Sequence, residues 1–325
     1  MGPGRSAAVA PDVHPAVRET AADIDEMRVR GAAAIADAAA AALARQAAES
    51  EADDADSLRE ALRAAARELL DTRPTAVSLP NALRDVLADI EGPSDAATLR
   101  EQVRERAAAF RERVAEAQDE LGRVGAGRLA DGDVLMTHCH STAVVACVAA
   151  ARERGHDLSA YVTETRPRNQ GHRTARELVD LGVDVTVVVD GAARHFVNDV
   201  DHVLVGADTV AADGSVVNKI GTCGLAANAR DCGTPVTVAA GTLKLDPETL
   251  TGHAVEIEER DPDEVLAPAD REAIGDVSVA NPAFDVTPPR YVDAVVTERG
   301  QFPPTSVVTL MREVYGTDPA RPWEA

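Results

Sequence analysis

The segment VLMTHCHST at residues 134–142 leads from an apolar run to a thiol, and the sequence after it repeats the arrangement with other polar groups. A second apolar run, VLVGAD at 203–208, ends in a carboxylate, and NKIGT at 218–222 adds a cation ten residues later. Ligands bind parallel sheets beyond the carboxyl ends of the strands. The sequence therefore predicts a common cleft for the thiol, the carboxylate and the cation.

Short β-branched runs alternate with helical stretches through the last two thirds of the chain. The predicted strands are 134–136, 160–162, 183–189, 203–205 and 236–238, and the predicted helices are 142–155, 170–181, 191–199 and 221–232. Continuous apolar strands alternating with helices are typical of a parallel sheet covered on both faces. The predicted fold class is therefore α/β, with the sheet domain at 133–325.

The first part of the chain has a helical pattern. Residues 16–123 are alanine-rich and charged, with apolar side chains three and four positions apart, which predicts a domain of three or four helices. These helices are expected to break near 51–53, 72–74 and 92–94. The Gly/Pro/Ala-rich residues 1–15 predict a disordered lead, and the glycine-rich residues 124–132 predict a linker.

The amino-acid composition favours an acidic enzyme and argues against a nucleic-acid-binding or membrane-spanning protein. The 325 residues include 33 Lys plus Arg and 55 Asp plus Glu, giving a net charge of −22, which resembles an enzyme of a salt-loving prokaryote. Such charge argues against nucleic acid as a partner, and no apolar run has membrane-spanning length. We expect a cytoplasmic protein with free thiols. The chain has only two lysines, Lys219 and Lys244, both in the stretch described above.

Cys139 is the candidate nucleophile or base among four cysteines. It follows a predicted strand and precedes a predicted helix, so the helix dipole could lower the pKa of its thiol. The alternative is a buried structural cysteine. Adjacent residues of an extended segment point to opposite sides, so His138, Cys139 and His140 cannot easily bind one ion together, and no second His/Cys cluster completes a site; no metal site is predicted.

Asp208 is the candidate proton carrier. Burial at a strand end could raise its pKa, whereas the alternative reading is a helix N-cap. Asn218 and Lys219 precede the glycine that opens the next predicted helix, which suggests a phosphate cradle, and Lys244 adds a second cation.

Two arginine-bearing segments complete the candidates. Arg166 and Arg168 follow a predicted strand and fit either an anion or an adjacent subunit. Arg30 lies beside Gly31, a glycine expected within a helix, where it would permit close approach of the backbone.

Five motifs together resemble one family. THCHS at 137–141, ETRPR at 164–168, GAD at 206–208, NKIGT at 218–222 and NPAFDVTP at 281–288 resemble the sugar-phosphate isomerases related to the regulatory subunits of the translation-initiation guanine-exchange factor. The resemblance extends from Arg30 to about Pro304. Within the family, His140-Ser141 resembles the members that act on ribose 1,5-bisphosphate.

The resemblance implies a helical N-terminal domain, a Rossmann-like C-terminal domain and homo-oligomers, either dimers or hexamers. It implies conversion of ribose 1,5-bisphosphate to ribulose 1,5-bisphosphate in nucleotide (AMP) salvage, with Cys139 as proton acceptor, Asp208 as proton donor and no metal or organic cofactor. The residues implied to hold the bisphosphate are Arg30, Gly31, Ala32, Ala33, Arg73, Ser141, Thr142, Ala143, Asn218, Lys219 and Lys244. Ala33 stands where the family often has glycine.

Two alternatives remain open. One is a methylthioribose-1-phosphate isomerase of methionine salvage, which needs an apolar pocket in place of the second phosphate site. The other is a non-catalytic regulatory subunit, although such subunits are expected to lack the Cys139 and Asp208 pair.

Overall fold

The computed structural model describes residues 12–73 and 76–324. Its contacts divide the chain into two compact units, Met1–Ala115 with Pro319–Ala325, and Glu116–Asp318, called here the helical unit and the sheet unit. The predicted disordered lead falls mostly on residues 1–11, outside the described residues. Of the remainder, Val13 is buried and the first helix begins at Pro15.

The helical unit is built from amphipathic helices packed through small side chains. Its elements are α1 (Pro15–Asp25), α2 (Ala32–Glu49), α3 (Ala55–Leu70), α4 (Ser78–Val86) and the first part of α5 (Ala96–Ala126). The breaks expected at 51–53 and 92–94 fall between these helices. Alanines on one face of α2, such as Ala36 and Ala39, are fully buried and allow close helix packing.

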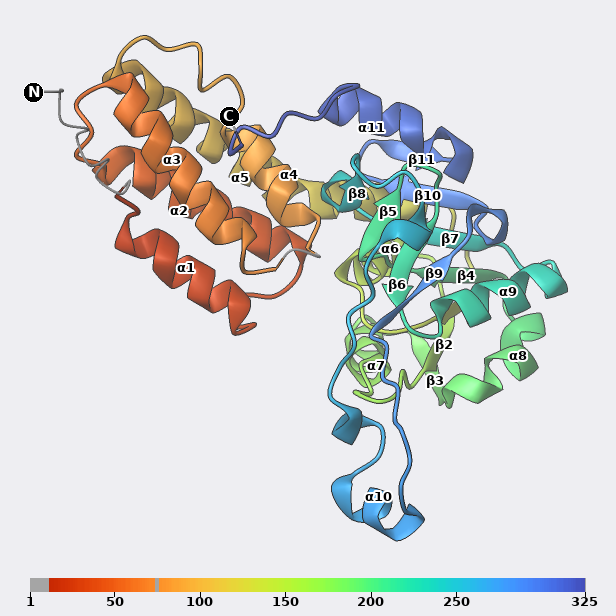
Figure 1. Cartoon of the computed structure of the whole chain (residues 1–325). Coiled ribbons are helices and arrows are strands. Elements are labelled where there is room, and N and C mark those ends of the chain that lie inside the picture. The colour runs from red at the N-terminus through yellow and green to blue at the C-terminus, as the bar shows by residue number, and fades with distance from the viewer. Residues whose placement is uncertain (1–11, 74–75, 325) are drawn as a thin grey trace, which may run out of the picture. The chain divides into compact units, whose positions relative to one another are not determined.

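The sheet unit contains the predicted parallel sheet, which confirms the α/β fold class (Figure 1). Its strands are β1 (Val134–Thr137), β2 (Ser159–Thr163), β3 (Asp184–Val188), β4 (His202–Val205), β7 (Val236–Ala239), β10 (Ala294–Thr297) and β11 (Gly300–Phe302). Their order is β11-β10-β7-β4-β1-β2-β3, parallel except for β11 at one edge. The last two strands were not predicted.

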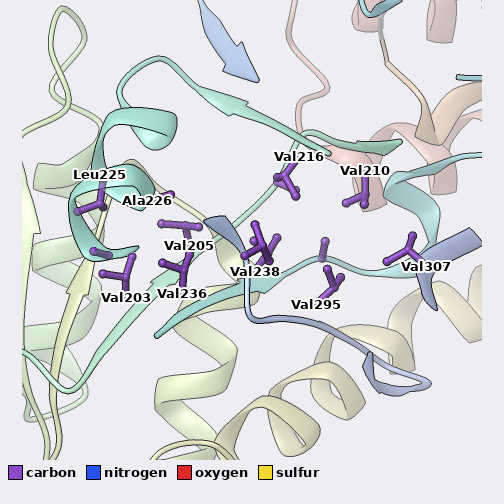
Figure 2. Packing of buried hydrophobic residues seen from close by; sticks show 14 of the residues in the cluster. Val203, Val205, Val210, Val216, Leu225, Ala226, Val236, Val238, Val295 and Val307 are labelled. Atoms are coloured by element: carbon purple, nitrogen blue, oxygen red, sulfur yellow. The ribbon is translucent and has the colours of Figure 1, made fainter. Parts of the chain in front are cut away.

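Helices cover both faces of this sheet. Successive strand residues point to opposite sides, so the apolar strands present hydrophobic side chains on both faces. Val203 and Val205 of β4 pack in a cluster with Leu225 of α9 (Thr222–Cys232) and Val307 of α11 (Val307–Tyr315) (Figure 2). The intervening Leu204 packs in a second cluster with residues of α5, α6 (Thr142–Glu153) and α7 (Gly171–Asp180). The helix expected at 191–199 is shorter, with α8 (Ala193–Phe196) flanked by 3-10 turns.

A second sheet lies beyond the first and was not predicted. It has four short strands, β8 (Leu245–Asp246), β5 (Thr209–Ala211), β6 (Val216–Lys219) and β9 (Phe284–Thr287), in that order. Between β8 and β9 the chain extends into an arm that carries the short helix α10 (Pro268–Ile274) (Figure 1). The second sheet places the motif at 218–222 on a strand end rather than on a loop.

Helix α5 continues to Ala126, so Gly125, expected in the linker, and Gly122 just before the linker both lie in this helix, whereas Gly127 and Gly132 follow it. A Cβ atom on Gly125 would lie 2.2 Å from the Cys147 sulfur, and one on Gly122 would lie 2.8 Å from the Ala146 carbonyl oxygen. These glycines therefore allow α5 to pack closely against α6. In the ranges 12–73 and 76–324, no helix has the length and apolar character needed to cross a membrane.

Candidate active site

Cys139 is held in an unusual backbone conformation between β1 and α6. Its φ angle is +68°, in the left-handed region that non-glycine residues rarely adopt. Its N–H donates to Thr165 Oγ1 at 2.8 Å, and its carbonyl accepts from Thr174 Oγ1 at 2.8 Å. The side chain is only 6% exposed. Strain of this kind persists where surrounding bonds fix the backbone, which is typical of functional sites.

The expected lowering of the Cys139 pKa is wrong. The pKa of the thiol is raised to about 11, mainly by burial and in smaller part by the charge of Asp208. The His140 N–H and the charges of Lys219 and Arg260 oppose this effect. The residue that caps α6 is Ser141, whose Oγ accepts from the Val144 N–H at 3.4 Å. The thiol therefore lies before the first turn of the helix, and burial has the largest effect on its pKa.

Asp208 lies at the end of β4, as predicted, but neither of the two expected environments is found. Its side chain is exposed, so the expected burial is wrong, and no helix follows it. Its N–H donates to the Val217 carbonyl at 2.9 Å, which places it where the chain passes into the second sheet. Its charge acts on both Cys139 and Lys219, so the structure brings these three groups near one another, two at strand ends of the main sheet and Lys219 at the end of β6 in the second sheet.

Lys219 is a buried cation at the end of β6. It is 5% exposed, its Nζ donates to the Ala283 carbonyl at 3.0 Å, and it lies 4.3 Å from the centre of the Phe284 ring. Burial lowers the pKa of the ammonium group, and the nearby Arg260 charge lowers it further. Within the described residues these two neutral groups are its bonding partners. A buried cation without a bonded carboxylate suits an anionic ligand.

The helix N-terminus expected to cradle a phosphate is already occupied. Gly221 precedes α9, and the Asp285 carboxylate accepts the Gly221 N–H at 2.8 Å and the Cys223 N–H at 3.1 Å. Burial nevertheless raises the pKa of Asp285 to about 6. Asn218 Nδ2 donates to Thr222 Oγ1 at 3.0 Å. In this motif, the Lys219 ammonium group, rather than the backbone N–H groups of the helix, is therefore the candidate hydrogen-bond donor to a phosphate.

The motifs around Cys139 and Asp208 are in direct contact. A Cβ atom on Gly206 would lie 2.4 Å from Ser141 Oγ, so glycine is required for the two segments to meet. Ser141 is followed by Thr142 and Ala143, which open α6. Lys244 Nζ donates to the Ala207 carbonyl, which places the second lysine beside Asp208.

The histidines beside Cys139 are engaged by protein groups. His138 is buried, its Nε2 donates to the Ile220 carbonyl at 2.8 Å, and its Nδ1 lies 2.6 Å from Thr163 Oγ1. Burial lowers the pKa of His138 and favours the neutral ring. His140 Nε2 lies 3.0 Å from a Glu177 carboxylate oxygen. Across the described part of the chain, no group of three or more His, Cys, Asp or Glu side chains could hold a metal ion.

The remaining predicted residues belong to the helical unit. Arg30 is exposed and its Nε donates to the Met27 carbonyl. Gly31 was expected within a helix, but it is the residue before α2, with φ at +88°, and Ala32 and Ala33 open that helix. Its role is therefore a backbone turn that glycine adopts without strain. Arg73 follows α3 and is half-buried.

Sequence reasoning missed Asp190 and Thr165, which support Cys139. The Asp190 carboxylate accepts the N–H groups of Thr165 at 2.8 Å and Arg166 at 2.7 Å, and Thr165 in turn accepts the Cys139 N–H. Asp190 follows β3, so the strand-end rule that selected Cys139 and Asp208 would have found it.

The arginines of the ETRPR motif bind within the chain rather than remaining open to an anion. Arg168 forms a two-pronged ion pair with Glu264, and Arg166 Nη2 donates to the Val265 carbonyl at 3.4 Å. Both contacts join the loop that supports Cys139 to the base of the arm.

Several known proteins are similar to this chain over nearly its whole length. A ribose 1,5-bisphosphate isomerase from Haloferax volcanii is 62% identical over 311 residues, covering 96% of this chain and 96% of the relative. A solved 5-methylthioribose 1-phosphate isomerase from Pyrococcus horikoshii OT3 has a TM-score of 0.73 and 34% identity, covering 93% of this chain and 88% of that chain. A translation initiation factor eIF-2B from the same organism has a TM-score of 0.76 and 32% identity, covering 91% and 99%.

The family assignment covers both units. The model of the initiation factor 2 subunit family matches residues 28–304, which include the start of α2, the rim of the main sheet and the arm. With this match and the near full-length relatives, the chain belongs to the initiation factor 2 subunit family.

Proposed function

We propose that this protein is an aldose–ketose isomerase that converts α-D-ribose 1,5-bisphosphate to D-ribulose 1,5-bisphosphate. The observation that carries the proposal is the meeting of a buried thiol, an exposed carboxylate and a buried cation at one rim of the sheet. The name of the Haloferax volcanii relative supports the substrate. By the family resemblance, we place the reaction in nucleotide (AMP) salvage.

The first step of the proposed mechanism is a proton transfer within the pair. Because burial keeps the Cys139 thiol protonated at neutral pH, it needs an acceptor before it can act as a base. Transfer of its proton to the Asp208 carboxylate gives a thiolate and a carboxylic acid together. The charges of Lys219 and Arg260 favour the thiolate, which reduces the cost of this transfer.

The carboxylic acid and the thiolate then act on the sugar in one step. The thiolate takes the C2 proton, the C1=C2 double bond forms, the bond from C1 to the ring oxygen breaks, and Asp208 protonates that oxygen. The product is an open-chain enol that still carries the phosphate on O1. Protonation at C1 and loss of the C2 hydroxyl proton give the ketone. Each positioned proton transfer contributes about 10²–10⁴-fold in rate.

The two phosphates supply binding and orientation. Lys219 and Lys244 are the cations of the sheet unit proposed to bind them, with Asn218 and Ser141 as polar neighbours. We propose that Arg30 to Ala33 and Arg73 contribute further contacts. Fixing both ends of an acyclic intermediate converts binding energy into alignment of C1 and C2 with the acid and the base.

The experiment that tests the proposal is ³¹P and ¹H NMR of ribose 1,5-bisphosphate incubated with the protein in molar KCl. Wild type is expected to produce ribulose 1,5-bisphosphate, whereas Cys139→Ser and Asp208→Asn are not. Cys232→Ser is the matched control, since this half-buried cysteine lies on α9 beside Arg194 and should leave turnover unchanged.

One alternative has a specific observation in its favour. The likeness to a methylthioribose-1-phosphate isomerase supports a substrate with a single phosphate. Consumption of methylthioribose 1-phosphate without turnover of the bisphosphate would establish it. Lack of turnover of both sugars by wild type would instead support a regulatory protein.

A further inference from the structure

Arg260 lies at the base of the arm and is fixed there by a short backbone ladder. Its N–H donates to the Asn281 carbonyl at 2.9 Å, and the Ala283 N–H donates to the Glu258 carbonyl at 2.8 Å. This antiparallel pairing of 258–260 with 281–283 continues directly into β9, whose first residue, Phe284, pairs with Lys219 of β6. Arg260 and Lys219 are therefore held by the same small set of paired segments.

The guanidinium of Arg260 is largely buried and only partly satisfied. Its side chain is 11% exposed, and its Nε donates to Glu258 at 3.1 Å. Its two terminal nitrogens have no hydrogen-bond partner in the part of the chain that the structure describes. A largely buried guanidinium normally forms hydrogen bonds through Nε and through both terminal nitrogens. The terminal N–H groups of Arg260 are therefore available to donate to a planar or tetrahedral oxyanion.

Arg260 and Lys219 share the Phe284 ring. The Lys219 Nζ lies 4.3 Å from the ring centre and the Arg260 Cζ lies 5.6 Å from it. Two like charges held this close repel each other, and Glu258 is the one carboxylate paired with either of them within the described residues. Such a pair of cations, one of them buried, is stabilised by an added anion.

A second set of contacts joins the arm segment that carries Arg260 to the loop beside Cys139. Four residues beyond Arg260, Glu264 forms the two-pronged ion pair with Arg168. Arg168 belongs to the loop whose Thr165 accepts the Cys139 N–H. Consistent with this arrangement, the charge of Arg260 acts on the Cys139 thiol.

We propose that Arg260 is a substrate-binding residue, whose terminal guanidinium nitrogens, together with the Lys219 ammonium beside the same Phe284 ring, bind one phosphate group of the sugar phosphate. The proposal rests on the proposed function for the identity of the ligand as a phosphate ester. Glu258 holds the guanidinium in place through Nε and leaves the terminal nitrogens facing the ligand. The arm thereby contributes to the site that Cys139 and Asp208 form.

The test compares Arg260→Gln and Arg260→Lys with Arg271→Gln, a matched control on the same arm whose arginine pairs with Asp263. The first measurement is steady-state kinetics with ribose 1,5-bisphosphate in molar KCl. Loss of charge-assisted hydrogen bonds to a phosphate is expected to raise KM about tenfold or more in Arg260→Gln. Arg260→Lys should recover part of this loss, kcat should change less than KM, and Arg271→Gln should match wild type.

The second measurement uses inorganic phosphate as the probe and needs no turnover. Wild type and Arg271→Gln should show a saturable rise in Tm with phosphate relative to KCl of equal ionic strength, and Arg260→Gln should lose it.

An unchanged KM together with an unchanged phosphate response in Arg260→Gln would overturn the proposal, as would a fall in kcat alone. If wild type does not turn over the bisphosphate but phosphate stabilises it through Arg260, the proposed function fails while the anion site stands. If Arg260→Gln does not fold, Arg260→Lys decides, since a phosphate response smaller than that of wild type supports binding by the guanidinium and a full response excludes it.

Discussion

Cys139 and Asp208 occupy equivalent positions at the ends of neighbouring parallel strands, yet their surroundings are opposite. After β1 the chain turns through a left-handed residue into helix α6, and the thiol is buried. After β4 the chain passes straight into a second sheet, and the carboxylate is exposed. The element that follows a strand, rather than the strand itself, therefore sets which of the two groups is buried and which is exposed to solvent.

The largest expected effect comes from removing either member of this pair. Cys139→Ala and Asp208→Asn should each lower kcat by about 10²–10⁴-fold, because each abolishes one proton transfer. Their effects on stability should differ, since Cys139 is buried and Asp208 is exposed. Steady-state kinetics and calorimetry measure the two effects. Equal loss of activity with unequal change in Tm would show that the two residues are equally needed for turnover but contribute differently to stability. Turnover by Cys139→Ala at the wild-type rate would remove the thiol from the mechanism.

The next effect is the pH dependence of thiol reactivity. With the pKa of Cys139 raised to about 11, alkylation by iodoacetamide should increase about tenfold for each pH unit from 7 to 10. Mass spectrometry of the modified peptide measures this rate. The half-buried Cys223, whose pKa burial also raises, provides an internal reference. A rate at Cys139 that levels off near pH 8 would contradict the dominance of burial.

The contact between the two strand ends can be broken at Gly206. Gly206→Ala places a Cβ atom 2.4 Å from Ser141 Oγ, so the helix cap must move. Overpacking and the lost cap should lower the free energy of unfolding by about 2–4 kcal/mol, as urea titration would measure. Gly224→Ala is the control, because nothing lies within 4 Å of its Cβ position in helix α9 and it should stabilise instead. If both variants respond alike, the contact has no special role.

The smallest effect concerns the hydroxyl that holds the Cys139 backbone. Thr165→Val leaves the Cys139 N–H buried without its acceptor, which should lower the free energy of unfolding by about 1–3 kcal/mol. Thr165→Ser keeps the oxygen and should retain both stability and kcat. Chemical denaturation and kinetics of the two variants provide the measurement. A valine variant as stable and active as the serine variant would contradict the role assigned to this hydrogen bond.

The sequence predicts five of the seven strands of the main sheet, because each of the five is a short apolar run that can be recognised without knowledge of its neighbours in space, whereas β10 and β11 were missed. The second sheet escapes prediction since its strands, from 209–211 to 284–287, are two to four residues long and far apart in the chain. The direction of the Cys139 pKa is missed for a similar reason. A helix start can be recognised locally, whereas burial of the thiol depends on Thr165 and Thr174, which come from other elements.

Among the residues of the site, those at strand ends were predictable and those held by cross-strand contacts were not. Asp190 directly follows a predicted strand, so the rule that selected polar residues at strand ends would also have selected it. Arg260 lies in the arm, 41 residues beyond Lys219, and comes to it only through pairing with β9. No spacing in the sequence indicates that approach.

The scarcity of lysine has a practical consequence for chemical labelling. Lys219 and Lys244 are the only lysines of the 325 residues, and both lie within the candidate site. Burial lowers the pKa of Lys219 and so increases the fraction of unprotonated, nucleophilic amine. The side-chain amines that an amine-selective acylating reagent can label are therefore those of the candidate site. Apart from the α-amino group, labelling of this protein reports on Lys219 and Lys244.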